Sequence, residues 1–370
     1  MLPILEMRDI TKTFPGVKAL TDVNRTVMPA EIHGVVGENG AGKSTLMKVL
    51  SGVYPAGTFD GVIRFEGQDR QFKTISDSED IGIIIIHQEL ALVPLLSIAE
   101  NIFLGQETAK NGVINWFEAF SKTRKLLEKV GLKEHPNTLI TNIGTGKQQL
   151  VEIAKALNKK VKLLILDEPT SSLNERDSEA LLDLLRGFKA QGISSILITH
   201  KLNEVVEVAD RITVIRDGKT VDTLDVKDGT VDEDRIIKAM VGRDLTDRYP
   251  PRSVPIGEPV LEVKNWNVYH PLHSDRHTIR DVSLNVRAGE VVGIAGVAGN
   301  GQGEFFDAIS GERRQENADT ISLRGIACGQ KGVSERRLTG AGFVPEERLG
   351  HGAVPTMSLS DNLFLSRSVS

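Results

Sequence analysis

The stretch GENGAGKST, residues 37–45, lies between an apolar run (IHGVV, residues 32–36) and a run with helical spacing that continues to Leu50. Its glycines let backbone N–H groups close around phosphate oxygens without clashes from Cβ atoms. Lys43 would then reach the outer phosphates of a nucleotide, and the Ser44 hydroxyl would be a ligand for Mg²⁺. A glycine-rich turn that binds nothing is the alternative, but the flanking strand and helix favour a phosphate-binding loop.

A second apolar run (KLLIL, residues 162–166) ends in Asp167 and Glu168. At the end of a strand, both side chains would project toward the bound phosphates. Asp167 could then hold Mg²⁺ through water, and Glu168 could polarise an attacking water. An Asp-Glu pair after a strand is by itself usually a solvated turn, so the phosphate-binding loop upstream is what favours the catalytic interpretation.

Gln88 and His200 each follow another apolar strand, IGIIII and SSILIT. The Gln88 amide could reach the metal ion and the attacking water, and His200 could donate to the γ-phosphate. A glutamine or histidine at a strand end is more often a cap or a satisfied surface residue. In the order loop, Gln, Asp-Glu, His, these residues form a candidate γ-phosphate sensor. His33 and His87 lack this context and are interpreted as structural.

The composition indicates a soluble globular protein of two domains, because 370 residues are too many for one ordinary domain. The net charge of −5 offers no basic field, so no nucleic-acid partner is predicted. The longest apolar stretch, residues 81–96, is interrupted by His87, Gln88 and Glu89, so no transmembrane segment is expected. The lone Cys328 excludes an intramolecular disulfide.

The chain repeats itself in the same order. LEMRDITKTF at Leu5 recurs as LEVKNWNVYH at Leu261, and the segment that contains the phosphate-binding loop recurs from Ile279 as IRDVSLNVRAGEVVGIAGVAGNGQGE. This self-similarity indicates two copies of one domain. The predicted organisation is a complete domain at 1–245, a proline-rich linker at 246–258 and a truncated second copy at 259–370.

Short apolar runs alternate with helical patterns in the first copy, which predicts an α/β fold with a mainly parallel sheet wrapped by helices. A helix-rich block between about residues 90 and 160 is expected to be an inserted subdomain. The predicted helices cover residues 43–51, 120–130, 148–157, 176–191 and 203–209.

The second copy of the loop has Gln302 where the first has Lys43, and Gly303 where the first has Ser44. A neutral amide cannot replace the attraction of an ammonium group for a triphosphate. At most weak nucleotide binding, and no hydrolysis, is therefore expected in the second copy.

The order Phe14, GENGAGKST, Gln88, IGTGKQQLVEIAKAL, LLILDEPTSSL, ITH resembles the nucleotide-binding domain of ABC transporters, a P-loop NTPase fold. The resemblance implies ATP and Mg²⁺ as cofactors and stacking of Phe14 on adenine. The implied ATP-binding residues are Phe14, Gly37, Glu38, Asn39, Gly40, Ala41, Gly42, Lys43, Ser44 and Thr45. The implied catalytic residues are Glu168, His200 and Gln88, and the implied metal ligands are Ser44, Gln88 and Asp167.

The resemblance also implies a signature loop, here Gly144, Thr145, Gly146, Lys147 and Gln148. Gly144 stands where the family usually has a serine, so one hydroxyl donor is missing. Backbone donors and a helix beginning at Lys147 could still bind a phosphate, whereas a plain helix-capping turn is the alternative. ABC sites are composite, so the intact loop would need a signature from another molecule, for instance in a homodimer through the first domain.

FPGVKAL, MVGRDLTDRYP and the tandem layout resemble the double-domain ATPases of bacterial monosaccharide importers, and YPAGTFDGVIRFEG is most similar to the D-xylose and multiple-sugar branch. This implies a sugar permease and, indirectly, a periplasmic sugar-binding protein as partners, with the chain at the cytoplasmic face of the inner membrane. The residues after Gln88 would contact the permease. Alternatives are an importer of ribose, galactosides or nucleosides, a truncated ATP-binding module with little turnover, and a soluble ABC ATPase that acts on ribosomes or DNA.

Overall fold

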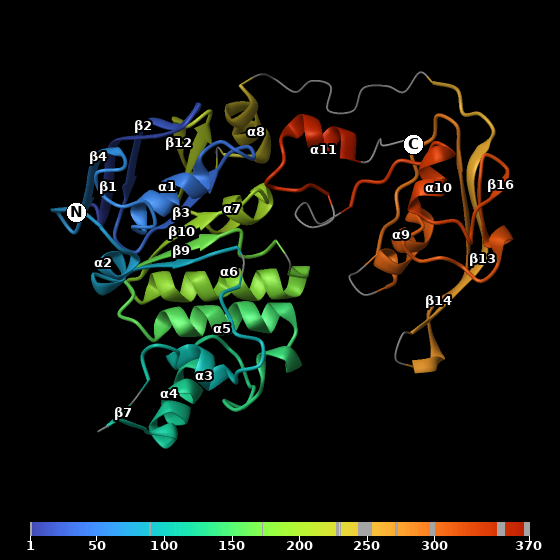
Figure 1. Cartoon of the computed structure of the whole chain (residues 1–370). Coiled ribbons are helices and arrows are strands. Elements are labelled where there is room, and N and C mark those ends of the chain that lie inside the picture. The colour runs from blue at the N-terminus through green and yellow to red at the C-terminus, as the bar shows by residue number, and fades with distance from the viewer. Residues whose placement is uncertain are drawn as a thin grey trace. The chain divides into compact units, whose positions relative to one another are not determined.

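The computed structural model describes residues 2–88, 90–107, 109–110, 112–171, 173–226, 229, 231–242, 254–270, 273–296, 300–345 and 352–365. The chain divides into two compact units, Met1–Arg248 and Tyr249–Ser370. Each unit has its own secondary structure (Figure 1).

The strands of the first unit are β1 (Leu5–Phe14), β2 (Val17–Val27), β3 (Ile32–Val36), β4 (Asp60–Phe65), β5 (Gln68–Arg70), β6 (Ile83–Ile86), β7 (Ala109–Lys110), β8 (Val113–Ile114), β9 (Leu163–Asp167), β10 (Ser194–Ile198), β11 (Arg211–Arg216) and β12 (Lys219–Asp225). Its helices are α1 (Lys43–Leu50), α2 (Ile75–Asp80), α3 (Ile98–Phe103), α4 (Trp116–Lys129), η1 (Ile140–Asn142), α5 (Thr145–Leu157), α6 (Glu175–Ala190), α7 (Leu202–Val208) and α8 (Glu233–Val241).

A six-stranded sheet with the order β12-β11-β3-β10-β9-β6 forms the centre of the first unit. All neighbouring strands are parallel except the antiparallel pair β11–β12. Its strands are continuously apolar because both faces are buried. In β9, for example, Leu163 and Ile165 face one core, and Leu164 and Leu166 face the other. The predicted mainly parallel α/β fold is thus confirmed.

A second, antiparallel sheet with the order β2-β1-β4-β5 covers the side of the central sheet that carries α1 (Figure 1). Strand β1 alternates buried and exposed positions over part of its length, and its residues Leu5, Met7 and Ile10 are buried. Such alternation is typical of a sheet with one solvated face. The sequence interpretation named no such sheet, because it followed the continuous apolar runs only.

Helices α5 and α6 lie on the opposite face of the central sheet, and α3 and α4 pack beyond α5 (Figure 1). The helix predicted at 120–130 is longer at its N-terminus, because the Asn115 side chain caps α4 by accepting from Glu118 N. The prediction that the helix of the signature segment begins at Lys147 or Gln148 was wrong, since α5 already begins at Thr145.

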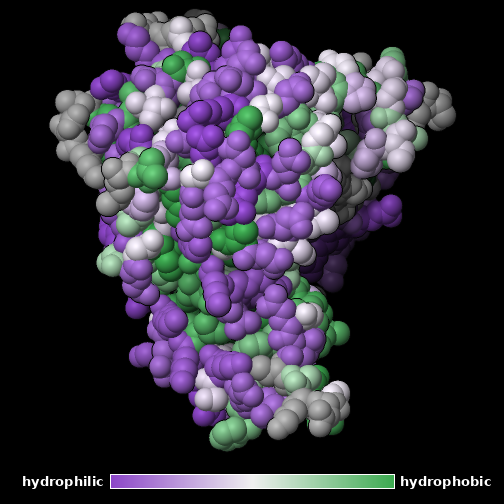
Figure 2. Space-filling model, turned by 90° about the vertical axis from the view of Figure 1, so that its left-hand side faces the viewer, coloured by the Kyte–Doolittle hydropathy of each residue, from purple (hydrophilic) through white to green (hydrophobic). Residues whose placement is uncertain are grey.

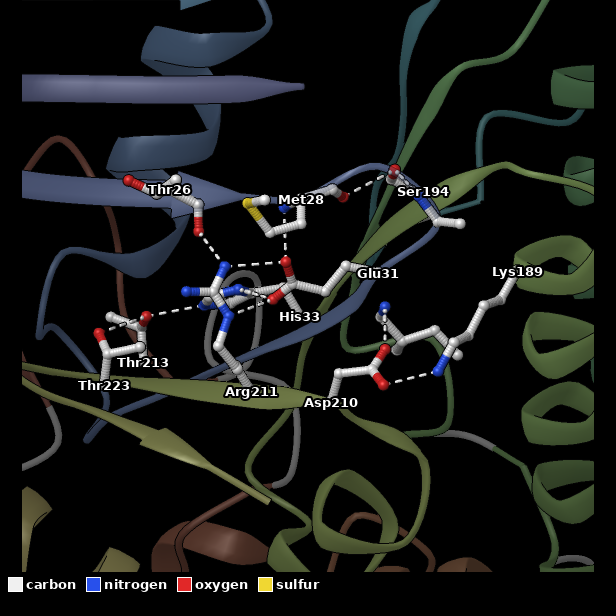
Figure 3. A network of polar contacts seen from close by, with 12 residues as sticks. Thr26, Met28, Glu31, His33, Lys189, Ser194, Asp210, Arg211, Thr213 and Thr223 are labelled. Atoms are coloured by element: carbon white, nitrogen blue, oxygen red, sulfur yellow. Dashed lines mark hydrogen bonds and ion pairs between the residues drawn. The ribbon is translucent and has the colours of Figure 1, made fainter. Parts of the chain in front are cut away.

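A buried polar network lies at the start of β3 (Figure 3). Glu31 accepts from His33 Nδ1 at 2.8 Å and from both Nε and Nη2 of Arg211 at 2.8 Å, and His33 Nε2 lies 2.7 Å from the Thr213 hydroxyl. His33 is completely buried. It is a structural residue in this arrangement, at the opposite end of β3 from the phosphate-binding loop.

The second unit contains β13 (Pro259–His270), β14 (His273–Arg287), α9 (Gln302–Ser310), η2 (Ala318–Thr320), β15 (Ile321–Leu323), β16 (Ile326–Ala327), α10 (Val333–Leu338) and α11 (Leu359–Leu365). Its four strands form one antiparallel sheet, β14-β13-β15-β16. A small core around Trp266, Phe305 and Ile321 packs between this sheet and α9. The apolar residues 291–296 belong to no strand or helix.

Hydrophilic side chains predominate on the face shown in Figure 2, and hydrophobic side chains occur in groups between them. None of the helices in the described part of the chain combines the length and the apolar character needed to cross a bilayer.

Candidate functional site

The phosphate-binding loop leads directly into α1. Gly42 precedes the helix with a φ of +103°, a conformation that glycine adopts without steric cost. Gly37 is needed for a different reason, since a Cβ there would lie 2.2 Å from the Ile215 carbonyl oxygen. Lys43 folds back over the loop, and its Nζ donates to the carbonyl oxygens of Gly37 at 2.8 Å and Glu38 at 3.0 Å.

The loop faces the end of β9. The Ser44 hydroxyl lies near Asp167, the last residue of that strand. Burial raises the pKa of Asp167, although the Ser44 hydroxyl opposes the rise. Burial likewise lowers the pKa of Lys43, against the opposing attraction of Glu168 and Asp167. The ammonium group and both carboxylates thus lie in one partly buried cluster, which is typical of functional sites.

Glu168 is the point where the separate motifs meet. Its Oε2 accepts from Gln88 Nε2 at 3.2 Å and lies 3.4 Å from His200 Nδ1. These residues follow β6, β9 and β10, and the carboxyl ends of neighbouring parallel strands share one edge of the sheet. Glu168 has a φ of +48°, and its N–H donates to the Ile198 carbonyl oxygen at 2.9 Å. Sequence reasoning did not anticipate this unusual backbone conformation.

Phe14, half-buried, ends β1 and contacts two residues that sequence reasoning missed. The Tyr54 ring meets it edge to face with centroids 5.4 Å apart, and Lys12 Nζ lies 5.2 Å from the Phe14 centroid. The Lys12 ammonium also lies 5.0 Å from the Tyr54 ring and donates to the Thr58 carbonyl oxygen. The only sequence signal for this contact was the aromatic residue Tyr54, which follows α1 in the segment VYP.

The remaining loop residues differ in exposure. Glu38, Asn39 and Gly40 are exposed, whereas Ala41 is buried and Thr45 is half-buried in the first turn of α1. The Ala41 N–H donates to the Glu38 carbonyl oxygen at 3.1 Å and closes the turn.

The signature segment lies at the N-terminus of α5. Gly144 occupies the N-cap position without a side-chain cap, and a Cβ added there would meet no atom within 4 Å. Gly146 is different, because its Cβ would lie 2.5 Å from an Asp177 carboxylate oxygen. Lys147 forms an ion pair with Glu134, and Gln148 donates to carbonyl oxygens of residues 140 and 143. The N-cap residue of α5 therefore offers no side chain that could accept from the first N–H groups of this helix.

The loop of the second unit repeats one feature of the first. Gly301 has a φ of +94° and precedes α9, as Gly42 precedes α1. Gln302 takes the place of the lysine, and its amide lies against Gly296, where an added Cβ would approach Nε2 to 2.3 Å. The ammonium charge of the first loop has no counterpart at this position.

Comparisons with known proteins show the family to which the chain belongs. A family model described as ABC transporter matches residues 20–171. The chain is 58% identical over 365 residues to the L-arabinose transport ATP-binding protein AraG of Geobacillus stearothermophilus, covering 98% of this chain and 71% of that protein. It is 48% identical to the xylose import ATP-binding protein XylG of Thermoanaerobacter pseudethanolicus, with 98% and 71% covered. The ADP conformation of MJ1267, an ATP-binding cassette of an ABC transporter, superposes with a TM-score of 0.56 at 25% identity, covering 66% of this chain and 100% of that one.

The chain therefore belongs to the ABC transporter family. The P-loop fold predicted from the motifs is thus confirmed for this chain. Its predicted resemblance to sugar-import ATPases is confirmed as well. The individual site residues and the repeat of the domain at 259–370 stay predictions.

Proposed function

We propose that the first unit binds ATP with Mg²⁺ and hydrolyses it, and that this hydrolysis powers monosaccharide import through a membrane permease. The observation that carries the proposal is the meeting of Gln88, Glu168 and His200 at the strand edge that faces the phosphate-binding loop. Structural ion-pair clusters also occur at strand ends. The adjacent Lys43 and the nearness of the Ser44 hydroxyl to Asp167 favour phosphate chemistry over that alternative.

In this proposal, Lys43 exchanges its two loop carbonyl partners for the outer phosphates of ATP. Backbone N–H groups of the loop and the N-terminus of α1 bind the remaining phosphate charge. Phe14, with one edge supported by Tyr54, stacks on the adenine ring. Because Lys12 lies over the same aromatic pair, a face of Phe14 not covered by Lys12 would receive the base.

Ser44, Asp167 and Gln88 would hold Mg²⁺. Their hydroxyl, carboxylate and amide oxygens are the hard donors that this ion prefers, and the Ser44 hydroxyl already lies near Asp167. When bound, the ion would neutralise phosphate charge.

Glu168 would accept a proton from the water that attacks the γ-phosphate. Gln88 and His200 both contact the same carboxylate oxygen, so they orient the base before the nucleotide binds. His200 could in addition donate to a γ-phosphate oxygen.

The signature segment would act on a second nucleotide-binding domain. The open N-terminus of α5, at Gly144 and Thr145, can donate backbone N–H groups to the γ-phosphate of ATP held by a partner. We infer that two chains pair through their first units.

The permease would contact the helical subdomain. A groove of about 180 Å³ lies there, and the neighbouring Phe117 and Leu95 are 86% and 78% exposed. Its lining residues are Leu96, Glu100, Phe103, Leu104, Glu107, Ile114, Trp116 and Ala119. In this proposal the chain would lie at the cytoplasmic face of the inner membrane, and a periplasmic sugar-binding protein would supply the permease. The names of the relatives favour a pentose, L-arabinose or xylose, over ribose, galactosides or nucleosides.

The test is the ATPase rate per chain as a function of protein concentration. We expect a rate that rises with concentration, and a loss of about 10²- to 10⁴-fold in Glu168→Gln with ATP binding retained. Lys43→Ala should weaken ATP binding by about 10- to 100-fold or more, because it removes charge-assisted bonds to phosphate. Rapid hydrolysis by Glu168→Gln would remove Glu168 from its role. A flat rate near zero with intact binding would favour the alternative of a module with little turnover.

A further inference from the structure

Three side chains beside the site form a connected group that none of the roles above requires. The Thr170 hydroxyl donates to Glu204 Oε2 at 2.6 Å, and Lys201 Nζ donates to the Thr170 backbone oxygen at 2.8 Å. Lys201 Nζ also lies 3.1 Å from Glu204 Oε1, which closes the group. Thr170, Lys201 and Glu204 are called the loop clamp below.

The loop clamp is buried. Thr170 is 1% exposed and Glu204 is 7% exposed, so the Glu204 carboxylate is almost removed from water. A buried carboxylate is costly unless it is paired and hydrogen-bonded. Here one oxygen accepts from a hydroxyl and the other faces an ammonium group, so the loss of either partner should have a measurable effect.

Both ends of the loop clamp adjoin the catalytic pair. Thr170 follows Glu168 by two residues, and Lys201 directly follows His200. The Thr170 backbone oxygen and side chain are both held from the residues around α7, so the loop after β9 and the start of α7 are joined at two points. Glu168 belongs to one of these joined segments and His200 to the other, and their side chains lie 3.4 Å apart.

The backbone at Glu168 needs such support. A φ of +48° is unfavourable for a residue with a Cβ, and a strained conformation persists only where the surroundings hold it. The hydrogen bond from the Glu168 N–H to the Ile198 carbonyl oxygen is one restraint. The loop clamp restrains the chain on the other side of the same residue.

We propose that Thr170, Lys201 and Glu204 are positioning residues that hold the strained Glu168 backbone and its pairing with His200 in the geometry used for ATP hydrolysis. They touch neither nucleotide nor attacking water and act only through Glu168 and His200. The inference rests on the proposed function for its kinetic consequence. Its structural consequence, a rigid backbone at Glu168, is independent of turnover.

The experiment compares Thr170→Val, which keeps the shape and removes the hydroxyl, with Thr170→Ser, which keeps the hydroxyl. Thr123→Val is the matched control, because the Thr123 hydroxyl is also buried and donates to the backbone oxygen of Ala119 at 2.9 Å, within α4. For each variant, kcat, the Kd of ATP and amide hydrogen exchange are measured on the full chain.

We expect Thr170→Val to lower kcat by about tenfold or more while the Kd of ATP changes by less than about threefold. The Glu168 amide should exchange at least about tenfold faster relative to the amide of Ile196 in β10. Thr170→Ser and Thr123→Val should resemble wild type in kcat and in the exchange rate of the Glu168 amide relative to that of Ile196. Lys201→Met should act in the same direction as Thr170→Val, and the two effects should be less than additive in the double variant.

Equal behaviour of Thr170→Val and Thr170→Ser, or an equal increase of exchange at Glu168 and Ile196, would overturn the proposal, because either result describes a merely structural contact. If wild-type protein does not hydrolyse ATP, the proposed function fails, and the exchange ratio at Glu168 still decides the positioning role.

Discussion

The segment before the glycine-rich loop is a buried strand in the first unit and an exposed segment outside any strand in the second. Ile32, the first residue of β3, is 1% exposed, whereas Val291 at the matching position of the second unit is 84% exposed and lies in no strand. Both segments are apolar. What differs is the presence of partner strands, because β3 pairs with β10 and β11, which come more than 150 residues later in the chain.

By contrast, β13, β14, β15 and β16 form a complete antiparallel sheet from partners that are close in sequence. Apolar character is thus necessary for a parallel strand but insufficient, since a parallel strand needs partners that arrive from distant segments.

A short motif after each glycine-rich loop makes the same point for a helix. In the first unit, the Val93 N–H donates to Asn101 Oδ1 at 2.7 Å, and in the second the Val354 N–H donates to Asn362 Oδ1 at 2.7 Å. The local hydrogen bonds are therefore repeated. The packing is not, because α3 contacts α4 and α5 whereas α11 has no buried residue. This contact-level likeness supports the proposal that residues 259–370 repeat the first domain.

The largest expected difference is in amide hydrogen exchange. The amides of β3 should exchange at least about 1,000-fold more slowly than those of residues 291–296, because opening β3 requires most of the global unfolding free energy, about 5 kcal/mol or more. Exchange followed by mass spectrometry on peptides from both regions of one sample measures this ratio. Comparable protection in the two regions would mean that residues 291–296 acquire partner strands in solution.

A matched pair of substitutions should sharpen the comparison at the helices. Ile98 in α3 is 0% exposed and Leu359 in α11 is 86% exposed. Ile98→Ala should lower the free energy of unfolding of the first unit by about 2–5 kcal/mol, because it leaves a cavity in the core. Leu359→Ala should change stability by less than about 0.5 kcal/mol. Urea unfolding of both variants checks this, and a large loss in Leu359→Ala would show that α11 is buried in solution.

The difference between local and distant contacts also explains what the sequence could predict about the site. The phosphate-binding loop, Asp167 and Glu168 were recognisable because each belongs to a short motif with fixed spacing and a strand beside it. The loop clamp could not be predicted, since Thr170 and Glu204 are joined only by the fold. The early start of α5 was missed because Gly144 and Gly146 are poor helix formers, so the sequence favoured a later start.

In the second unit Val292 stands at the position that matches His33, so the imidazole of the network around Glu31 has no counterpart there. Burial and the nearby Arg25 lower the pKa of His33 to about 4, and its bond to Glu31 opposes this only in part. In the unfolded chain the pKa of His33 would be near 6.5. Between pH 4 and pH 6.5 the unfolded chain therefore binds more protons than the folded chain.

Stability of the first unit should consequently fall as pH drops from about 6.5 to about 4, by up to about 3 kcal/mol. Glu31 extends the loss to lower pH. Burial would raise its pKa, but bonds from His33 and Arg211 outweigh burial and hold the pKa at about 2, below its usual 4.5. Urea unfolding between pH 7.5 and 4.5 measures the slope. His33→Val, which copies the second unit, should flatten the slope in that window, and an unchanged slope would assign it to other groups.

Arg25 also differs between the two units, since its matching position in the second unit is Leu284. Arg25 is 4% exposed, and none of its three guanidinium nitrogens has a hydrogen-bond partner among the residues that the structure describes. Burial lowers the pKa of Arg25 to about 9. Glu31 keeps both of its bonds to Arg211 without it, so Arg25 is a buried charge whose attraction to Glu31 is not accompanied by a hydrogen bond.

Arg25→Leu should therefore raise the free energy of unfolding by about 1–3 kcal/mol, because it removes unsatisfied buried polar groups and keeps an apolar side chain of adequate size. Arg211→Leu is the contrasting variant, since it removes both bonds that Arg211 donates to the Glu31 carboxylate and should cost about 3–5 kcal/mol. Thermal and urea unfolding of both variants at pH 7 decide the sign. If Arg25→Leu were instead destabilising, the attraction between Arg25 and Glu31 would exceed the cost of burying the guanidinium. The pH slope should flatten in that variant, because Arg25 lowers the pKa of His33.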